Sequence, residues 1–169
     1  YEQFENTFFS PRFSISSESL ETTSSASDAY KKQEGSYFDS SFSYGLKFDK
    51  RNSAFQPSSG FISSWYQQIP IVSENQTIVN GYIITGYKEL VDDMIVSSGI
   101  YARAVNSLSN DDVRVSRRLY APSSRLRGFQ SGKVGPKDGD DHVGGNYIVT
   151  LNTSSTIPYV LQTQENMDL

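Results

Sequence analysis

Strict alternation of apolar and polar side chains is the clearest pattern in this chain, and it runs through residues 36–49. The even positions form an apolar face on which Phe38, Ser40 and Phe42 fall, whereas the odd positions form a polar face that contains Asp39. A repeat of two residues is that of a β-strand. Strands of globular sheets usually have about 5–6 residues, so this one matches a tilted strand that crosses a bilayer, which needs about 9–11 residues in the hydrocarbon.

Other stretches of similar length also predict strands. They are residues 9–20, 61–71, 77–91, 94–108 and a segment that begins at Tyr147 and ends at Pro158. Trp65 and Ile69 share one face of their stretch, and in another Ile100 and Ala104 lie together with Arg103 opposite them. The residues that follow Pro158 predict a tail without a partner strand.

The connections between these stretches are unequal in length. Short turns near Pro57 and at residues 92–93 alternate with longer polar loops at residues 22–32 and 109–146, and the connection after Ser73 is shorter than the others on its side. Short turns at one end and long loops at the other are typical of outer-membrane barrels. We therefore predict an all-β, antiparallel up-and-down meander of about six strands, a part of a transmembrane β-barrel. A soluble antiparallel sandwich is the alternative, and it would have shorter strands with turn signals every ~8–12 residues.

Composition narrows the class of protein further. The chain has 169 residues, a net charge of −4 and 36% hydrophobic residues, which suffices for one domain with a core. It has no Cys, which excludes a disulfide framework and thiolate metal sites. No apolar run reaches the ~18 residues of a transmembrane helix. Because the first residue is Tyr1 and not Met, we expect a piece of a longer protein.

The longest stretch that does not predict a strand is residues 117–146. Seven of the fifteen Lys and Arg residues lie in or just before it: Arg114, Arg117, Arg118, Arg125, Arg127, Lys133 and Lys137. Its many Gly residues predict irregular backbone with several positive φ angles. Leu126 and Phe129 flank the Arg127-Gly128 pair, which suits a loop docked into a cavity. A solvated basic loop is the alternative that the local sequence leaves open.

Three short motifs in this stretch carry a resemblance to a known family. They are Arg127-Gly128-Phe129, Gly135-Pro136 and Gly144-Gly145-Asn146. At these spacings the chain resembles the bacterial surface antigen superfamily, whose members include outer-membrane protein assembly factors. The resemblance covers residues from about 35 to 158.

The resemblance implies a fold and a function. The chain would be a fragment, residues 1–169, of one barrel domain of about sixteen strands, in the bacterial cell outer membrane. Residues 109–146 would be a loop directed into the lumen, in which Arg127 pairs with an acid beyond Leu169 while Phe129 anchors the tip. The family inserts and folds other outer-membrane proteins, here by templated strand pairing, without enzymatic chemistry or a cofactor. Its partners are unfolded outer-membrane proteins, accessory lipoproteins and the lipid bilayer. A polypeptide-translocating or passive transport barrel is the alternative.

Other chemistry has little support in the sequence. Asp138, Asp140 and Asp141 beside His142 lack the downstream Glu of a calcium loop and the ligand set of a zinc site, so we expect a solvated acidic tip and no metal. A single His among loop acids gives no nucleophile–base pair. The basic residues lack a platform of stacking aromatic side chains, so we expect no nucleic-acid partner.

Overall fold

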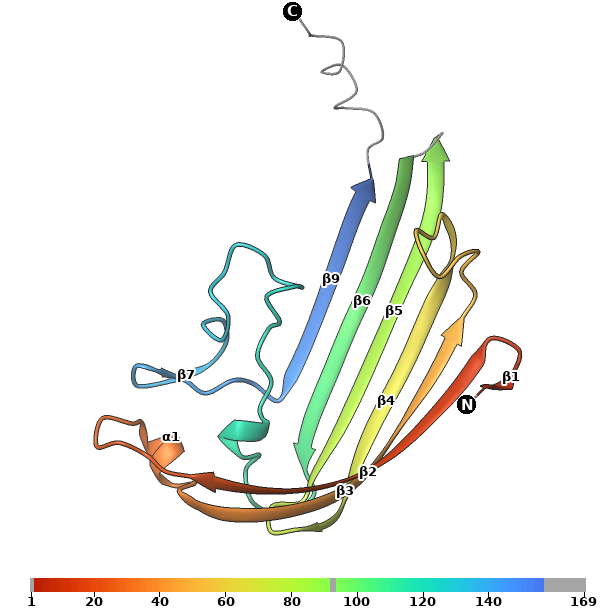
Figure 1. Cartoon of the computed structure of the whole chain (residues 1–169). Helices are drawn as coiled ribbons and strands as arrows, with labels where there is room; N and C mark the ends of the chain where they lie inside the picture. Colours follow the sequence, from red (N-terminus) through yellow and green to blue (C-terminus); the bar gives the residue numbers. More distant parts are fainter. Residues whose placement is uncertain (1, 92–93, 157–169) are drawn as a thin grey trace, which may run out of the picture.

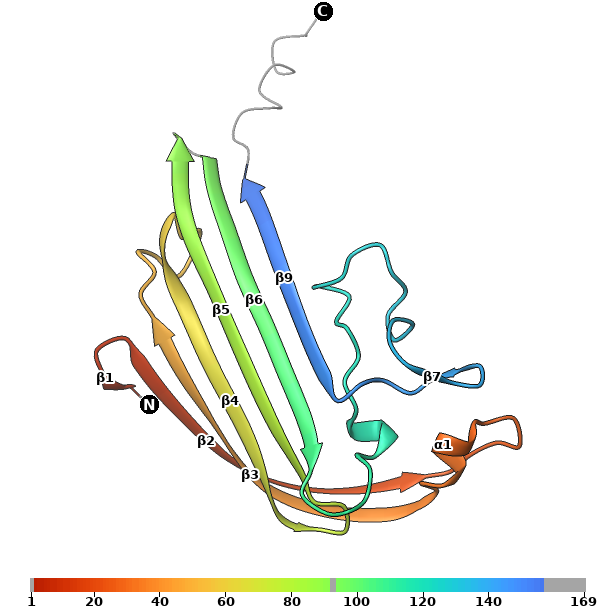
Figure 2. The ribbon, with the colours of Figure 1, turned by 180° about the vertical axis from the view of Figure 1, so that it is seen from behind.

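The computed structural model describes residues 2–91 and 94–156. In this part of the chain, seven strands form one antiparallel sheet in the order β1-β2-β3-β4-β5-β6-β9. Their bounds are β1 Glu2–Phe4, β2 Thr7–Leu20, β3 Gly35–Asp49, β4 Ser59–Ser73, β5 Thr77–Val91, β6 Met94–Ser107 and β9 Tyr147–Thr156. The sheet is strongly curved, as Figures 1 and 2 show from opposite sides.

The predicted fold class is confirmed. Each long strand pairs with the next one along the chain, and β6 pairs with β9 across the long loop, as in an up-and-down meander. Among the described residues the sheet is not closed, because β1 and β9 lie at its two edges. The predicted turn at residues 92–93, the strand end at Pro158 and the tail at 159–169 lie outside the described residues.

The two faces of the sheet differ in character. Large apolar side chains are exposed on the convex face, where Ile100 (43% exposed) pairs with Leu151 (71%). The concave face carries the buried Val79 (7%) and Val105 (0%). Arg103 lies between Ala102 and Ala104 in sequence and so points to the concave side, opposite Ile100, as predicted. The convex face therefore has the character of a surface made for lipid.

A β-bulge at Ile71 of β4 interrupts the pairing of β3 with β4. The register with β4 shifts between Ser40, opposite Val72, and Ser41, opposite Pro70. Pro70 has no N–H to offer the ladder, which explains why the irregularity occurs here. Ser40 lies opposite Ile15 of β2 in an unbroken register and so shares the face of Phe42, as predicted; it is 6% exposed and lines a small cavity with Asp39.

The connections follow the predicted asymmetry, with the two longest at one end of the sheet (Figure 1). One of them, between β2 and β3, contains the short helix α1, Asp28–Lys31. The other, between β6 and β9, contains a 3-10 turn η1, Val115–Arg117, and a small hairpin of β7, Lys137–Asp138, and β8, Asp141–His142. In the described residues no helix is long and apolar enough to cross a bilayer.

Candidate functional site

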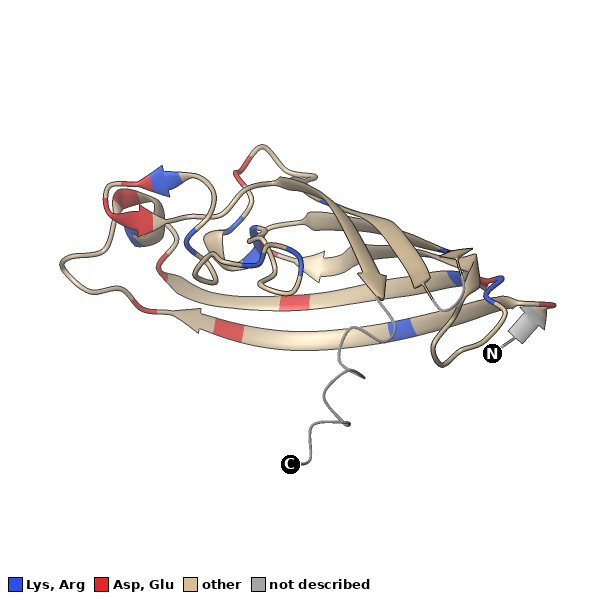
Figure 3. Cartoon of the chain, turned by 90° about the horizontal axis from the view of Figure 1, so that it is seen from above, with Lys and Arg blue, Asp and Glu red and all other residues tan. Residues whose placement is uncertain are grey.

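The loop of residues 109–146 lies on the concave side of the sheet (Figures 1 and 3). Val113 is 2% exposed and forms the core cluster with Val79 and Val105, against which Leu119 packs. Farther along the loop, the backbone oxygen of Arg125 accepts a hydrogen bond of 2.8 Å from Asn152 Nδ2 of β9. The loop is therefore a packed element, and the alternative of a solvated basic loop does not describe its first half.

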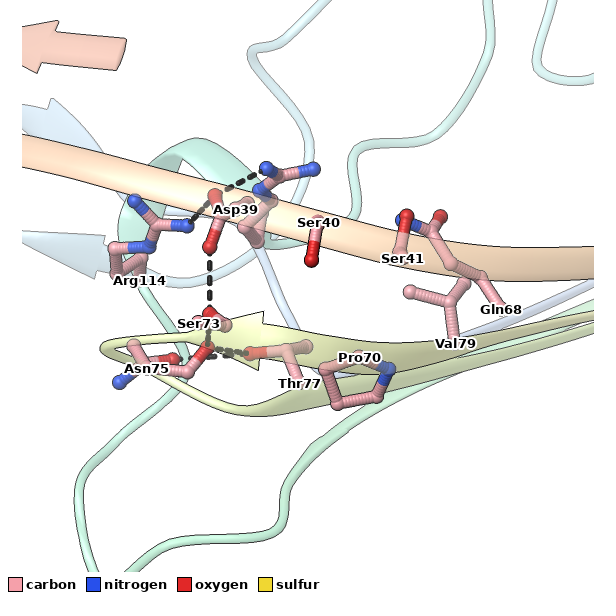
Figure 4. A pocket seen from close by; sticks show the side chains of 11 residues that line it. Asp39, Ser40, Ser41, Gln68, Pro70, Ser73, Asn75, Thr77, Val79 and Arg114 are labelled. Atoms are coloured by element: carbon pink, nitrogen blue, oxygen red, sulfur yellow. Dashed lines mark hydrogen bonds and ion pairs between the residues drawn. The ribbon is translucent and has the colours of Figure 1, made fainter. Parts of the chain in front are cut away.

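A charged cluster fixes the start of this loop to the wall of the sheet (Figure 4). We call Asp39, Ser73, Arg114 and Arg117 the Asp39 cluster. Asp39 Oδ2 accepts hydrogen bonds from Nη2 of Arg114 and, at 2.6 Å, from Nη2 of Arg117. The Ser73 hydroxyl donates to Asp39 Oδ1 at 2.5 Å. One carboxylate oxygen thus holds two guanidinium groups, while the other accepts from Ser73.

Arg114 is the most deeply buried member of the cluster, with a side chain that is 4% exposed. Its guanidinium lies over the ring of Tyr37, 4.3 Å from the centroid, and its Nη1 lies 3.5 Å from Oε2 of Glu18. Taking a charge out of water is costly unless it is paired. The position of this part of the loop therefore depends on Asp39 being present and ionised.

The sequence contained both halves of this cluster but not their pairing. Asp39 lies on the polar face of a strand next to Ser residues, and Arg114 and Arg117 belong to the basic run. The Arg114–Asp39 contact joins positions 75 residues apart. One general rule could have indicated the pairing. An ionised carboxylate on a membrane-spanning strand is energetically costly, so Asp39 should have a cationic partner.

The Arg-Gly-Phe motif lies at an open part of the loop. Gly128 has a φ of 83°, which fits the predicted positive φ. Arg127 is exposed, and Phe129 is 59% exposed. Within residues 2–91 and 94–156, Arg127 forms no ion pair. The pairing of Arg127 and the anchoring by Phe129 stay predictions, since the acid was expected beyond Leu169.

The other motif residues form the base of the loop. Gly135 and Gly144 have φ angles of 130° and 70°, as the predicted positive-φ positions require. Gly145 exchanges two backbone hydrogen bonds with Leu119, of 2.7 and 2.9 Å. The oxygen of Asn146 accepts from the N–H of Val105 at 2.8 Å, and that of Pro136 accepts from Val143. These residues bring the two arms of the loop together where the loop meets the sheet.

The acidic residues of the β7–β8 hairpin do not form a solvated tip. Asp141 Oδ2 accepts a hydrogen bond of 2.8 Å from the N–H of Ser27, and Asp138 Oδ2 accepts one of 2.8 Å from Ala29. These two amides belong to the N-cap residue and to the first turn of α1, where free N–H groups need acceptors. The expectation of a solvated tip was wrong for Asp138 and Asp141, and only Asp140 is exposed. Among the described residues no group of three or more potential ligands could hold a metal.

The docking of the hairpin on α1 is predicted to weaken in acid. Burial, and then the charges of Lys137 and Lys133, hold the pKa of His142 below its ordinary value. A group with a lowered pKa resists protonation in the folded state, so stability is lost as the pH falls through about 6.5. Spin labels on cysteines introduced at Ser24 and Asp140 should show a broader distance distribution at pH 5.5 than at pH 7.5. The variant His142→Asn should remove this dependence, and an unchanged broadening in the variant would assign it to another group.

Comparison with protein families gives a match over nearly the whole chain. A model of the Omp85 superfamily domain matches residues 3–168. The chain belongs to the Omp85 superfamily. The expected family is thereby confirmed, and with it a place in an outer-membrane β-barrel.

Individual relatives agree with this membership. The human sorting and assembly machinery component 50 homolog is 26% identical over 124 residues, which are 71% of this chain and 26% of that relative. The crystal structure of BamA from Haemophilus ducreyi lacking POTRA domains 1–3 superposes with a TM-score of 0.78 at 19% identity. The superposition covers 94% of this chain and 36% of that one. The chain thus spans about a quarter of the curated relative and about a third of the solved chain.

Proposed function

We propose that this chain is part of an outer-membrane assembly factor that inserts and folds other outer-membrane proteins. The similar proteins whose names state a role support this proposal, because one is a component of a sorting and assembly machinery. The observation that carries the proposal is the state of the long loop. Its two arms are fixed to the concave face, through the Asp39 cluster and through Asn146, while Arg127 remains exposed.

Such a loop would support the wall of a larger barrel from inside the lumen. With its base immobilised, the segment from Arg127 to Phe129 projects toward the wall that would complete the cylinder. An exposed guanidinium in a lumen finds its best partner in a carboxylate, which it binds through two parallel hydrogen bonds. We propose that Arg127 forms this pair with an acid elsewhere in the barrel and so sets the shape of the lumen.

The chemistry of assembly is strand pairing and needs no catalytic group. An opened barrel edge presents a row of free N–H and C=O groups, on which an incoming β-segment can add as a new strand. The loop supports this process indirectly, because the barrel opens at an edge only if the rest of the cylinder keeps its curvature. Unfolded outer-membrane proteins are then the substrates, and accessory lipoproteins are partners of the whole protein.

The substitution Arg127→Ala in the full-length protein tests this role. We expect reduced amounts of folded outer-membrane proteins, because the substitution removes the proposed ion pair and releases the loop tip. The measurement is the heat-modifiable, folded fraction of several outer-membrane proteins in cells. Lys133→Ala is the matched control, since Lys133 is an exposed basic residue of the same loop.

Two results would contradict the proposal. Normal assembly together with an unchanged barrel in Arg127→Ala would remove the assigned role from the loop. Normal assembly with a raised conductance across planar bilayers would favour a transport barrel, in which the loop is a constriction.

A further inference from the structure

The convex face carries a hollow near the loop end of the sheet. It has a volume of about 250 Å³ and lies over β4, β5, β6 and β9. Side chains that line it include Trp65, Asn80, Tyr82, Ala102, Ala104 and Tyr147. Ala102 and Ala104 form its floor, because these small side chains lie between the larger ones of the neighbouring strands.

The register places these residues in two rows across the strands. Asn80 pairs with Ala104, and Ala104 pairs with Tyr147, in the row nearer the loops. Tyr82 pairs with Ala102 in the next row on the same face. Two residues along a strand correspond to about 7 Å, so the hollow runs from a polar row near the loops into the apolar band.

A chain of hydrogen bonds ends at the upper edge of this hollow. The hydroxyl of Tyr44 donates to Oε1 of Gln67 at 2.8 Å, and Nε2 of Gln67 donates to Oδ1 of Asn80 at 2.7 Å. Nδ2 of Asn80 is the last donor group in this chain of hydrogen bonds. In residues 2–91 and 94–156, Nδ2 of Asn80 has no hydrogen-bond partner. A polar group that faces hydrocarbon is costly unless it finds an acceptor.

The place of the hollow determines what can occupy it. It is continuous with the convex face, which faces the bilayer in a barrel of this family. The material that covers such a face is lipid, and an acyl-ester lipid offers both an apolar chain and a carbonyl acceptor at the depth of the interface. The Nδ2 donor of Asn80 lies at the loop-side edge of the hollow, where the ester carbonyl would lie. The apolar floor of Ala102 and Ala104 lies where the acyl chain would follow.

We propose that this hollow binds one acyl-ester lipid of the leaflet that borders the loop end. The acyl chain lies over Ala102 and Ala104, and its ester carbonyl accepts a hydrogen bond from Nδ2 of Asn80. The site is independent of the role assigned to Arg127, which lies on the loop of the opposite face.

Trp65 provides a reporter for this site, because it is the one Trp in the chain and lines the hollow. The full-length protein, with Trp65 as its sole tryptophan, is reconstituted in vesicles of diether phosphatidylcholine, which lacks ester carbonyls. Diester phosphatidylcholine brominated in its acyl chains is then mixed in, and the quenching of Trp65 gives the relative affinity of the two lipids. We expect a preference for the ester of about two- to tenfold, as one net hydrogen bond would give. Exchanging the bromine label between the lipids should leave this ratio unchanged.

Three variants separate the parts of the site. Asn80→Leu should bring the ratio to about one, while Ala104→Leu should reduce quenching by either lipid because it fills the hollow. Gly86→Leu is the matched control: a Cβ added at Gly86 meets no atom within 4 Å, and the residue lies on the same face farther along β5. It should behave as the native protein does.

Several results would overturn the proposal. They are equal affinity for ester and ether lipids in the native protein, a preference that survives Asn80→Leu, or the same loss of preference in Gly86→Leu. If a protein partner covered the hollow instead, brominated lipid of either linkage would leave the fluorescence of Trp65 unchanged, and the proposal would also fail.

Discussion

Replacing Asp39 by Asn should release the start of the long loop from the sheet. The amide keeps the size of the side chain but leaves the guanidinium of Arg114, whose side chain is 4% exposed, without its main counter-charge. Breaking a buried ion pair by removing one partner costs about 3–5 kcal/mol. The lower end of this range applies, because Glu18 remains 3.5 Å from Nη1 of Arg114.

Limited proteolysis would measure this release. Trypsin can cut after Arg117 and Arg118, which are half-buried, and cutting at these two sites requires local opening of the start of the loop. A loss of about 3 kcal/mol in the free energy of opening corresponds to cleavage roughly 100-fold faster. Asp49→Asn is the matched control, since Asp49 pairs with Arg51 at the other end of β3. The control should be cut at the native rate.

A second variant distinguishes lost pairing from general damage. In the Asp39→Asn background, Arg114→Met removes the buried charge that was left alone, and we expect it to restore much of the protection. Removing both partners of a buried pair is often nearly neutral, whereas removing one is not. Native-like cleavage of Asp39→Asn, or no recovery in the double variant, would show that the cluster does not hold the loop.

The substitution Gly144→Val should separate the two arms of the loop at its base. Gly144 has a φ of 70°, and a Cβ added there would lie 3.0 Å from the backbone oxygen of Leu119 and 3.0 Å from the ring of Tyr120. A side chain in this backbone region costs about 1–3 kcal/mol, and the crowding adds to this cost. We expect faster hydrogen exchange at the amides of Leu119 and Gly145, which bond each other across the base.

Gly132→Val isolates the contribution of crowding. Gly132 has a φ of 73°, close to that of Gly144, but a Cβ there meets nothing within 4 Å. Replacing Gly132 by Val therefore adds backbone strain without crowding. Hydrogen exchange at the amides of Leu119 and Gly145 should stay unchanged. Equal exchange in the two variants would contradict the close approach of Gly144 to Leu119.

The long strands were predictable because alternation is a local property. The predicted strand at residues 77–91 has the observed bounds of β5, Thr77–Val91. For β4 the prediction of residues 61–71 was shorter than the observed Ser59–Ser73. Backbone pairing with a neighbour extends a strand beyond its apolar residues, and this pairing depends on the neighbour rather than on the strand itself.

The contacts within the loops were not predictable for the same reason. Helix α1 has only four residues, and its first amides are bound by Asp138 and Asp141, which lie 109 and 114 residues away from their partners. The pairing of Arg114 with Asp39 is equally remote. The sequence showed the charges, but side-chain periodicity within one segment carries no information about which distant segment neutralises them.

The hairpin that rests on α1 also determines what an antibody can recognise at this end of the barrel. Ser27 and Asp141 are joined in space although they come from different connections. An antibody raised against the folded surface would bind both segments at once. A synthetic peptide copied from either connection would present only half of that epitope.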